Sequence, residues 1–341
     1  MDITKEDSKM LKGVAILAML MLHLFCRTAN LPYTPLLWIG NIPFVYYLGL
    51  FGDICVSIFC FISGYAHFMQ NTASPANRWK HLLRFMIVFW IIVVLSSGVG
   101  LLTGNRAIPG NGKEFLLNCL TLRNSYNGAW WYANTYILLN VLQPFSRRFA
   151  ERCPVWVVLS AAFVFYTVGY GIRFWGWGAC DHAVLQWIIT HIGLLGTSYF
   201  PYMIGMVFCR KQPIGALRKW ISLHDVPNKC IFMITITIFV TMIVLHGIVP
   251  SLFVAVLTAT ATIVLLCICP MPHWLQNVLR FFGTHSTNIW LTHMFFYTGL
   301  LDGFVFRAKY PLLILLLMLL CSLAASYVIR WISKPILKFV R

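Results

Sequence analysis

The segment Met10–Cys26, MLKGVAILAMLMLHLFC, decides the class of fold, because it is an apolar run long enough to cross a bilayer as a helix. Runs of this kind recur along the whole 341-residue chain without a long polar interruption. The chain is 60% hydrophobic and 10% charged, whereas a soluble domain carries about 25% charged residues. We therefore expect an all-α, polytopic membrane helix bundle that forms one domain over residues 1–341, with no appended soluble domain.

Apolar runs and the breaks between them predict about ten transmembrane helices. The expected ranges are Met10–Cys26, Gly52–Gln70, Arg84–Leu102, Trp130–Phe149, Pro154–Ile172, a sixth span ending at Val207–Cys209, Cys230–His246, Pro250–Cys269, His285–Phe304 and Leu312–Trp331. The stretches Leu31–Leu50 and Lys113–Leu122 fit re-entrant or interfacial segments rather than spans. The stretch His182–Gly196 fits either the sixth span or a separate lateral helix.

The basic residues predict the orientation. With ten spans, 19 of the 26 Lys and Arg residues fall on the side of the N-terminus and 7 on the other side. Because basic residues accumulate in cytoplasmic loops, both termini are expected in the cytoplasm. The same positive-inside effect explains the net charge of +17 without a nucleic-acid partner, since the cations form short clusters between apolar runs. No cysteine pair has convincing zinc spacing, so no metal is expected.

Lys12 and His23 are polar residues within the first apolar run. They are eleven positions apart, which places them within about 20° of one helix face and roughly 16 Å apart along the axis. Taken singly, each has an ordinary explanation, a snorkelling lysine and a histidine packed against a neighbouring helix. Together on one face, they suit an anionic ligand with a distant reactive end, and polar residues inside spans mark functional sites.

The second span carries Asp53, Ser57, Cys60, Gly64 and His67 along one stripe. Small residues on such a stripe also favour a close helix–helix contact. Asp53, near the outer end, needs a partner, and His23 is one candidate.

Two later segments hold further candidates. Ser286 and His293 are seven positions apart and share a helix face. Trp130 and Trp131 begin the fourth span, where an aromatic belt at the membrane interface is the ordinary explanation.

These segments together resemble the acyltransferase 3 family of multi-pass O-acyltransferases that modify cell-envelope polysaccharides. Leu11–His23 resembles the family's basic residue followed by ten others and a histidine, and Ile58–Tyr65, which contains Ser63, resembles its Phe-rich Ser-Gly-Phe segment. Trp130–Tyr132, Ser286–His293 and Lys334–Pro335 are similar to later family segments in the same order.

The resemblance implies an O-acetyltransferase of the bacterial plasma membrane that takes an acyl group from cytoplasmic acyl-CoA, most often acetyl-CoA. The acceptor would be a hydroxyl of a surface polysaccharide or of its lipid-linked precursor. His23 would act as general base or briefly accept the acyl group, with Asp53 as the second catalytic residue.

The remaining candidates would bind or support the substrates. Lys12, Lys80 and Arg84 would hold the phosphates of the donor. The residues that would bind substrate or support the site are Ser63, Trp130, Trp131, Ser286 and His293. Membrane lipid is a further partner, and self-association is left open.

The chain departs from the family pattern at His81, where an Arg-x-x-Arg pair usually begins; only its second arginine, Arg84, is present. Many relatives also carry an extracytoplasmic esterase-like domain, so we expect transfer either directly to the acceptor or through a separate protein. The alternative function is a transporter or flippase of a lipid-linked sugar, although no internal repeat of the transporter kind is visible. A membrane module for a separate sensor or racemase-type enzyme is a third interpretation.

Overall fold

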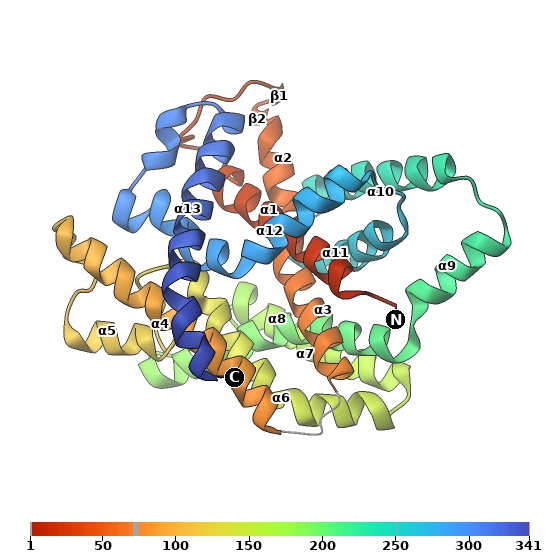
Figure 1. Cartoon of the computed structure of the whole chain (residues 1–341), viewed down its shortest axis with the longest axis horizontal. Coiled ribbons are helices and arrows are strands. Elements are labelled where there is room, and N and C mark those ends of the chain that lie inside the picture. The colour runs from red at the N-terminus through yellow and green to blue at the C-terminus, as the bar shows by residue number, and fades with distance from the viewer. Residues whose placement is uncertain (1, 71–74, 250, 341) are drawn as a thin grey trace. The chain divides into compact units, whose positions relative to one another are not determined.

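The computed structural model describes residues 2–70, 75–249 and 251–340, and these are almost entirely helical (Figure 1). In chain order the elements are α1 (Lys5–Phe25), β1 (Trp38–Ile39), β2 (Ile42–Pro43), α2 (Phe44–Phe51), α3 (Ile54–Met69), α4 (Pro75–Leu102), α5 (Gly112–Cys119), α6 (Trp131–Arg152), α7 (Val155–Trp175), α8 (Ala183–Lys211), α9 (Pro213–Leu223), α10 (Asn228–Ile248), α11 (Ser251–Ile268), α12 (His273–Thr292) and α13 (Pro311–Leu337). Short 3₁₀ helices lie at η1 (Gly128–Trp130), η2 (His293–Phe296), η3 (Gly299–Leu301), η4 (Phe304–Ala308) and η5 (Lys338–Val340). The strands β1 and β2 form an antiparallel hairpin that pairs Trp38 with Pro43.

The chain divides into two compact units, each assembled from separate segments. Unit 1 comprises Met1–Cys26, Tyr46–Asn71 and Val141–Thr284, and unit 2 comprises Arg27–Val45, Thr72–Asn140 and His285–Arg341. Boundaries fall inside α2, α6 and α12, so each of these three helices contributes residues to both units. The expectation of one domain over the whole chain stays a prediction.

Seven helices among the described residues are long and apolar enough to cross a membrane. They are Lys5–Phe25, Phe44–Met69, Arg78–Leu102, Val155–Trp175, Ala183–Lys211, Asn228–Ile248 and Pro311–Val340. The multi-pass character is confirmed, whereas the count of ten spans and the orientation stay predictions. The predicted fourth and ninth spans correspond to α6 and α12, which do not meet this criterion. The predicted eighth span corresponds to the apolar helix α11, whose side chains are described from residue 254 on.

Several predicted boundaries differ from the structure. The ninth span, expected over His285–Phe304, is wrong: α12 begins at His273 and ends at Thr292, and 3₁₀ turns follow. Gly299 and Gly303 have φ values of 72° and 66°, a left-handed conformation that an α-helix cannot contain.

The ambiguous stretches are resolved. His182–Gly196 is no separate lateral helix, because α8 runs unbroken from Ala183 to Lys211. The stretch 31–50 holds the β1–β2 hairpin and most of α2, and 113–122 holds most of α5. Pro250, the predicted start of the eighth span, lies outside the described residues, and α11 begins at Ser251.

Glycines bring the helices of unit 1 into backbone contact. A Cβ on Gly64 of α3 would collide with the carbonyl oxygen of Tyr202 in α8, and one on Gly205 would collide with that of Phe61. Such close approach is how helices associate in a membrane, where lipid tails remove the hydrophobic drive between them. The small-residue stripe of the second span thus makes the helix contact at Gly64.

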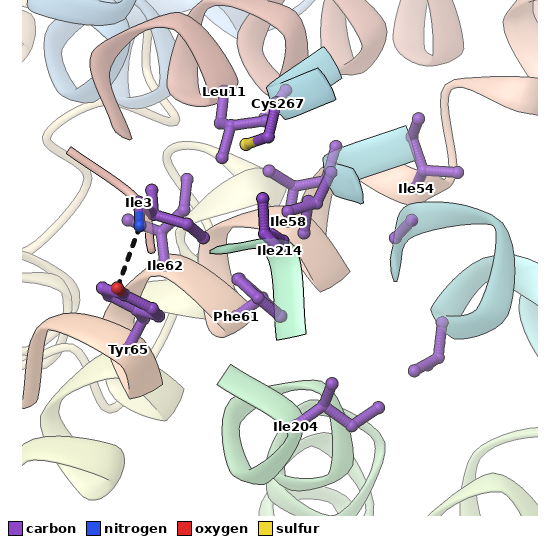
Figure 2. Close-up of a cluster of buried hydrophobic side chains, with 14 of the residues drawn as sticks. Ile3, Leu11, Ile54, Ile58, Phe61, Ile62, Tyr65, Ile204, Ile214 and Cys267 are labelled. Carbon is purple, nitrogen blue, oxygen red and sulfur yellow. Dashed lines mark hydrogen bonds between the residues drawn. The ribbon is translucent and has the colours of Figure 1, made fainter. Parts of the chain in front are cut away.

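Apolar side chains from six helices (α1, α3, α7, α8, α9 and α11) and from the N-terminal segment form the core of unit 1 (Figure 2). Ile58 and Phe61 of α3 are fully buried there, beside residues of α1, α8, α9 and α11. Ile3 joins this core, and its backbone N–H donates to the Tyr65 hydroxyl at 3.0 Å.

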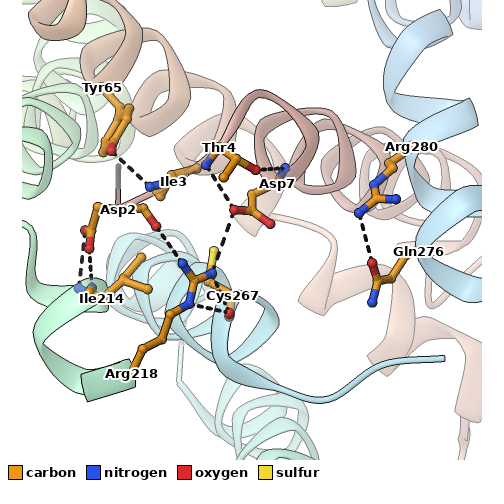
Figure 3. Close-up of polar contacts among 11 residues, drawn as sticks. Asp2, Ile3, Thr4, Asp7, Tyr65, Ile214, Arg218, Cys267, Gln276 and Arg280 are labelled. Carbon is orange, nitrogen blue, oxygen red and sulfur yellow. Dashed lines mark hydrogen bonds and ion pairs between the residues drawn. The ribbon is translucent and has the colours of Figure 1, made fainter. Parts of the chain in front are cut away.

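The polar N-terminal segment is fastened to the same unit (Figure 3). The buried Asp2 carboxylate accepts hydrogen bonds from the backbone N–H groups of Ile214 and Gly215 at the start of α9. Arg218 donates to the Asp2 carbonyl at 3.1 Å and to the Cys267 carbonyl of α11 at 2.7 Å. The bonds to Asp2 satisfy backbone N–H groups at the start of α9 that have no partner within that helix. Together with the Arg218 bonds, they hold the segment before α1 in place.

Gly64→Ala should destabilise the protein, because the added methyl group must push α3 away from the α8 backbone. Overpacking of this kind costs roughly 1–3 kcal/mol, which should appear as a lower melting temperature of the purified protein in detergent. Gly98→Ala is the matched control in helix α4, since its Cβ would meet nothing within 4 Å. The control should melt at or above the wild-type temperature. Equal melting of Gly64→Ala and wild type would contradict the contact.

Candidate active site

Lys12 and His23 lie on the single unbroken helix α1, as the sequence predicts. Both side chains are half-buried. Over an uninterrupted α-helix their separation along the axis is roughly 16 Å, on nearly the same face. One helix therefore holds a cation near its start and an imidazole near its end at a constant spacing.

Backbone contacts hold α1 in place near Lys12 and also near His23. Near Lys12, a Cβ on Gly13 would collide with the Leu279 carbonyl of α12, and one on Gly283 would collide with the Lys9 carbonyl. Near His23, a Cβ on Gly52 would collide with the Ala18 carbonyl. With no side chain between the backbones, α1 cannot slide or rotate freely against its neighbours in unit 1.

Asp53 lies at the turn between α2 and α3, inside one long apolar span. Its carboxylate interacts electrostatically with Arg173 and Tyr166, both from α7. The Arg173 guanidinium also donates from Nη1 to the Thr197 hydroxyl of α8 at 3.0 Å. Asp53 and Arg173 thus connect the α2–α3 turn with α7 and α8 of unit 1, whereas the suggested pairing of Asp53 with His23 stays a prediction.

The Ser63 hydroxyl bonds within its own helix. Its Oγ donates to the Phe59 carbonyl at 2.8 Å, and the side chain is half-buried. The neighbouring Gly64 makes the α3–α8 backbone contact described above. The segment Ile58–Tyr65 therefore serves helix packing in this structure.

In unit 2 the segment Asn127–Trp130 clamps the end of α12 through hydrogen bonds. Trp130 Nε1 and Asn127 Nδ2 both donate to the Leu291 carbonyl, at 2.9 and 3.0 Å. Trp290 Nε1 returns a bond to the Ala129 carbonyl at 3.0 Å. The last carbonyls of an α-helix have no partner within it, so these side chains stabilise α12 where it ends at Thr292.

The two candidate tryptophans, Trp130 and Trp131, differ in burial and packing. Trp130, the last residue of η1, is 1% exposed and packs edge-on against Phe89 and Phe295. Trp131 begins α6 and is half-buried, with its ring edge-on to Tyr132. Trp130 is therefore a supporting residue in the core of unit 2.

Ser286 and His293 are both buried in unit 2. His293 Nδ1 lies 2.8 Å from the Trp290 carbonyl, so Nδ1 carries the proton of the neutral ring. His293 belongs to η2 rather than to α12.

Lys80 and Arg84 project from α4 of unit 2, and both are exposed. Neither makes an ion pair with any residue that the structure describes. Their predicted role as donor-binding cations stays a prediction.

The candidates thus fall into two sets. Unit 1 holds Lys12, His23, Asp53 and Ser63. Unit 2 holds the others, Lys80, Arg84, Trp130, Trp131, Ser286 and His293. The sequence did not identify two residues that hold candidate residues in place. Arg173, the partner of Asp53, entered only as one of the basic residues outside the bilayer, and no sequence pattern pointed to Asn127, which bonds the end of α12.

Comparison with known proteins agrees with the resemblance of the motifs. No curated protein and no solved structure matches the chain. The model of the acyltransferase 3 family, described as an acyltransferase domain, matches residues 7–331. This range contains every candidate residue named above, and it covers nearly the whole chain. The chain therefore belongs to the acyltransferase 3 family, and it is a multi-pass membrane acyltransferase.

Proposed function

We propose that this protein is an O-acetyltransferase that moves an acetyl group from cytoplasmic acetyl-CoA to a hydroxyl of a surface polysaccharide or its lipid-linked precursor. His23 is the reacting residue and Lys12 contacts the donor phosphates. The proposed location is the bacterial plasma membrane. The observation that carries this proposal is the pair Lys12 and His23 on one unbroken helix, within a chain of an acyltransferase family.

The proposed reaction converts a thioester into an oxygen ester. The acceptor hydroxyl attacks the acyl carbon, the carbon–sulfur bond breaks, and the hydroxyl proton passes through His23 to the departing thiolate of coenzyme A. If His23 first accepts the acyl group itself, an acyl-imidazole forms before the hydroxyl attacks. A neutral imidazole suits both routes, because its unprotonated nitrogen is basic and nucleophilic.

The spacing of α1 supports the division of roles. Coenzyme A carries its negative charge at the nucleotide end and its thioester at the end of a long pantetheine arm. A cation and an imidazole roughly 16 Å apart on one face match these two ends. Asp53 would be the second catalytic residue, held in place by its interaction with Arg173.

Transfer of radiolabelled acetyl from acetyl-CoA by the purified protein tests the proposal directly. Label should move to an added saccharide acceptor in an amount that grows with time. A transporter or flippase of a lipid-linked sugar would move the saccharide across a vesicle membrane without transferring label. That outcome would overturn the proposed function.

His23→Ala should lower the rate of acetyl transfer by roughly 100- to 10,000-fold, the usual contribution of a general acid–base residue. The measurement is the initial rate with purified protein of normal melting temperature. His191→Ala is the control, because the His191 ring bonds the Trp187 carbonyl of its own helix at 2.8 Å. A His23→Ala protein with near-wild-type rate would refute the mechanism.

Lys12→Ala should raise the KM for acetyl-CoA about tenfold or more, since hydrogen bonds to charged groups contribute about 1.5–3 kcal/mol. Lys12→Arg should raise it less, because the positive charge is kept. Steady-state kinetics with varied donor concentration separate the two effects. A change confined to kcat would place Lys12 outside the donor site.

The proposed orientation puts Ser222 in the cytoplasm and Asn111 outside. Both positions are exposed in the structure. In a cysteine-depleted background, Ser222→Cys should resist a membrane-impermeant maleimide in intact cells and react after permeabilisation, whereas Asn111→Cys should react in both. Labelling of Ser222→Cys in intact cells would reverse the assigned side of α9.

A further inference from the structure

Helices α4 and α13 of unit 2 run antiparallel, so the start of α4 and the end of α13 share one end of the unit. Asn105, just beyond the end of α4, donates from Nδ2 to the Gly299 carbonyl of η3, which precedes α13. Helix α4 also contacts η5, which follows α13. Figure 1 shows the end of α13 beside α4.

Cations gather at this end of unit 2. They are the exposed side chains of Lys80, Arg84, Arg330, Lys334 and Lys338. None of the five makes an ion pair with a described residue. The acidic residues of unit 2 are Glu114, which pairs with Arg123, and Asp302, which lies between η3 and η4. Both belong to segments near the opposite end, so they do not neutralise the cluster.

One of these cations is attached to a buried polar network. Ser326 Oγ of α13 lies 2.8 Å from His285 Nδ1 and 3.0 Å from Asn288 Nδ2 of α12. His285, Asn288 and Ser326 are all buried. Arg330 Nη1 lies 3.4 Å from His285 Nε2. The guanidinium is therefore linked to two helices through side chains that cannot move freely.

The direction of these bonds follows from the chemistry of arginine. Guanidinium has five N–H donors and no acceptor, so Arg330 must donate to Nε2 of a neutral His285 ring. The ring proton then sits on Nδ1 and is donated to Ser326 Oγ. His285 uses one N–H of Arg330, and the other donors remain available to a ligand. A planar guanidinium held in this way matches the oxygens of a phosphate group.

We propose that Arg330, oriented by His285, anchors a phosphate-binding site at this end of unit 2, together with Lys80 and Arg84. Its ligand is the phosphorylated nucleotide end of coenzyme A, an assignment that rests on the proposed function. Phosphate groups of anionic lipids share this chemistry and are the other source. Arg330 is a binding residue, and His285 is a positioning residue that acts through it.

Binding of coenzyme A to the full-length protein, purified in a neutral detergent, tests the site. Isothermal titration should give a dissociation constant about tenfold higher for Arg330→Ala than for wild type, with Arg330→Lys between them. 3′-Dephospho-coenzyme A should bind wild type more weakly than coenzyme A does if Arg330 holds that phosphate, and Arg330→Ala should lose this difference. Arg307→Ala is the matched control, because Arg307 is exposed, lies on η4 before α13, and contacts the Phe304 ring.

Two variants of His285 separate positioning from folding. In His285→Gln the side-chain carbonyl can replace Nε2 as the acceptor for Arg330, so affinity should stay near the wild-type value. In His285→Asn the amide can replace Nδ1 as the donor to Ser326, but Arg330 loses its acceptor, so affinity should fall as in Arg330→Ala. Equal affinities for these two variants, both folded by melting temperature, would overturn the positioning role.

A second arm measures retention of phosphatidylglycerol against phosphatidylcholine by native mass spectrometry. Arg330-dependent binding of coenzyme A supports the site and its assignment. Arg330-dependent retention of phosphatidylglycerol alone would overturn the donor assignment in favour of a lipid head group. If neither depends on Arg330, the site is refuted. These readouts need no acetyl transfer, so binding without transfer would refute only the proposed function, and transfer without Arg330-dependent binding would refute only this site.

Discussion

Direct backbone contact through glycine is the constraint on which unit 1 depends. Helices in a bilayer gain little from burying apolar side chains, because lipid is equally apolar, and they associate by close packing. Gly13 and Gly283 join α1 to α12, Gly52 joins α2–α3 to α1, and Gly64 and Gly205 join α3 to α8. At each of these positions a single methyl group would meet a carbonyl oxygen, so the spacing of the helices has almost no tolerance.

This constraint also explains why the candidate catalytic residues can keep a defined geometry. His23 stands on α1, whose backbone meets Gly52 of the α2–α3 turn at Ala18, and Asp53 lies in that same turn. Residues held within a fraction of an ångström by rigid elements are what a reaction between two bound substrates requires. The side chains of Lys12 and His23 can rotate about their own bonds, but the α1 backbone that carries them is fixed by direct contact with neighbouring backbones.

The sequence predicts where the helices lie along the chain better than it predicts which helices pack against one another. Apolar length alone locates α1, α3, α4, α7, α10 and α13, because spanning a bilayer imposes a minimum run on each. Apolar length did not predict the amphipathic helix α9 or the first half of α12, because Arg218 and Arg280 interrupt the apolar runs there. The interaction of Asp53 with Arg173 could not be predicted, because it depends on which of many helices lie together, and periodicity within a helix says nothing about that. The same holds for the contact between His285 and Ser326.

The end of α12 shows how a residue of a family motif can stabilise the fold. Trp130 belongs to a segment that is similar to a family motif, and it was expected to bind substrate or to support the site. Its indole N–H donates to the Leu291 carbonyl, and its ring is enclosed. An indole has one donor, so Trp130 cannot also bind a sugar hydroxyl while the clamp is intact. We therefore expect a substitution of Trp130 to act on activity through α12, whose last turn Trp130 stabilises.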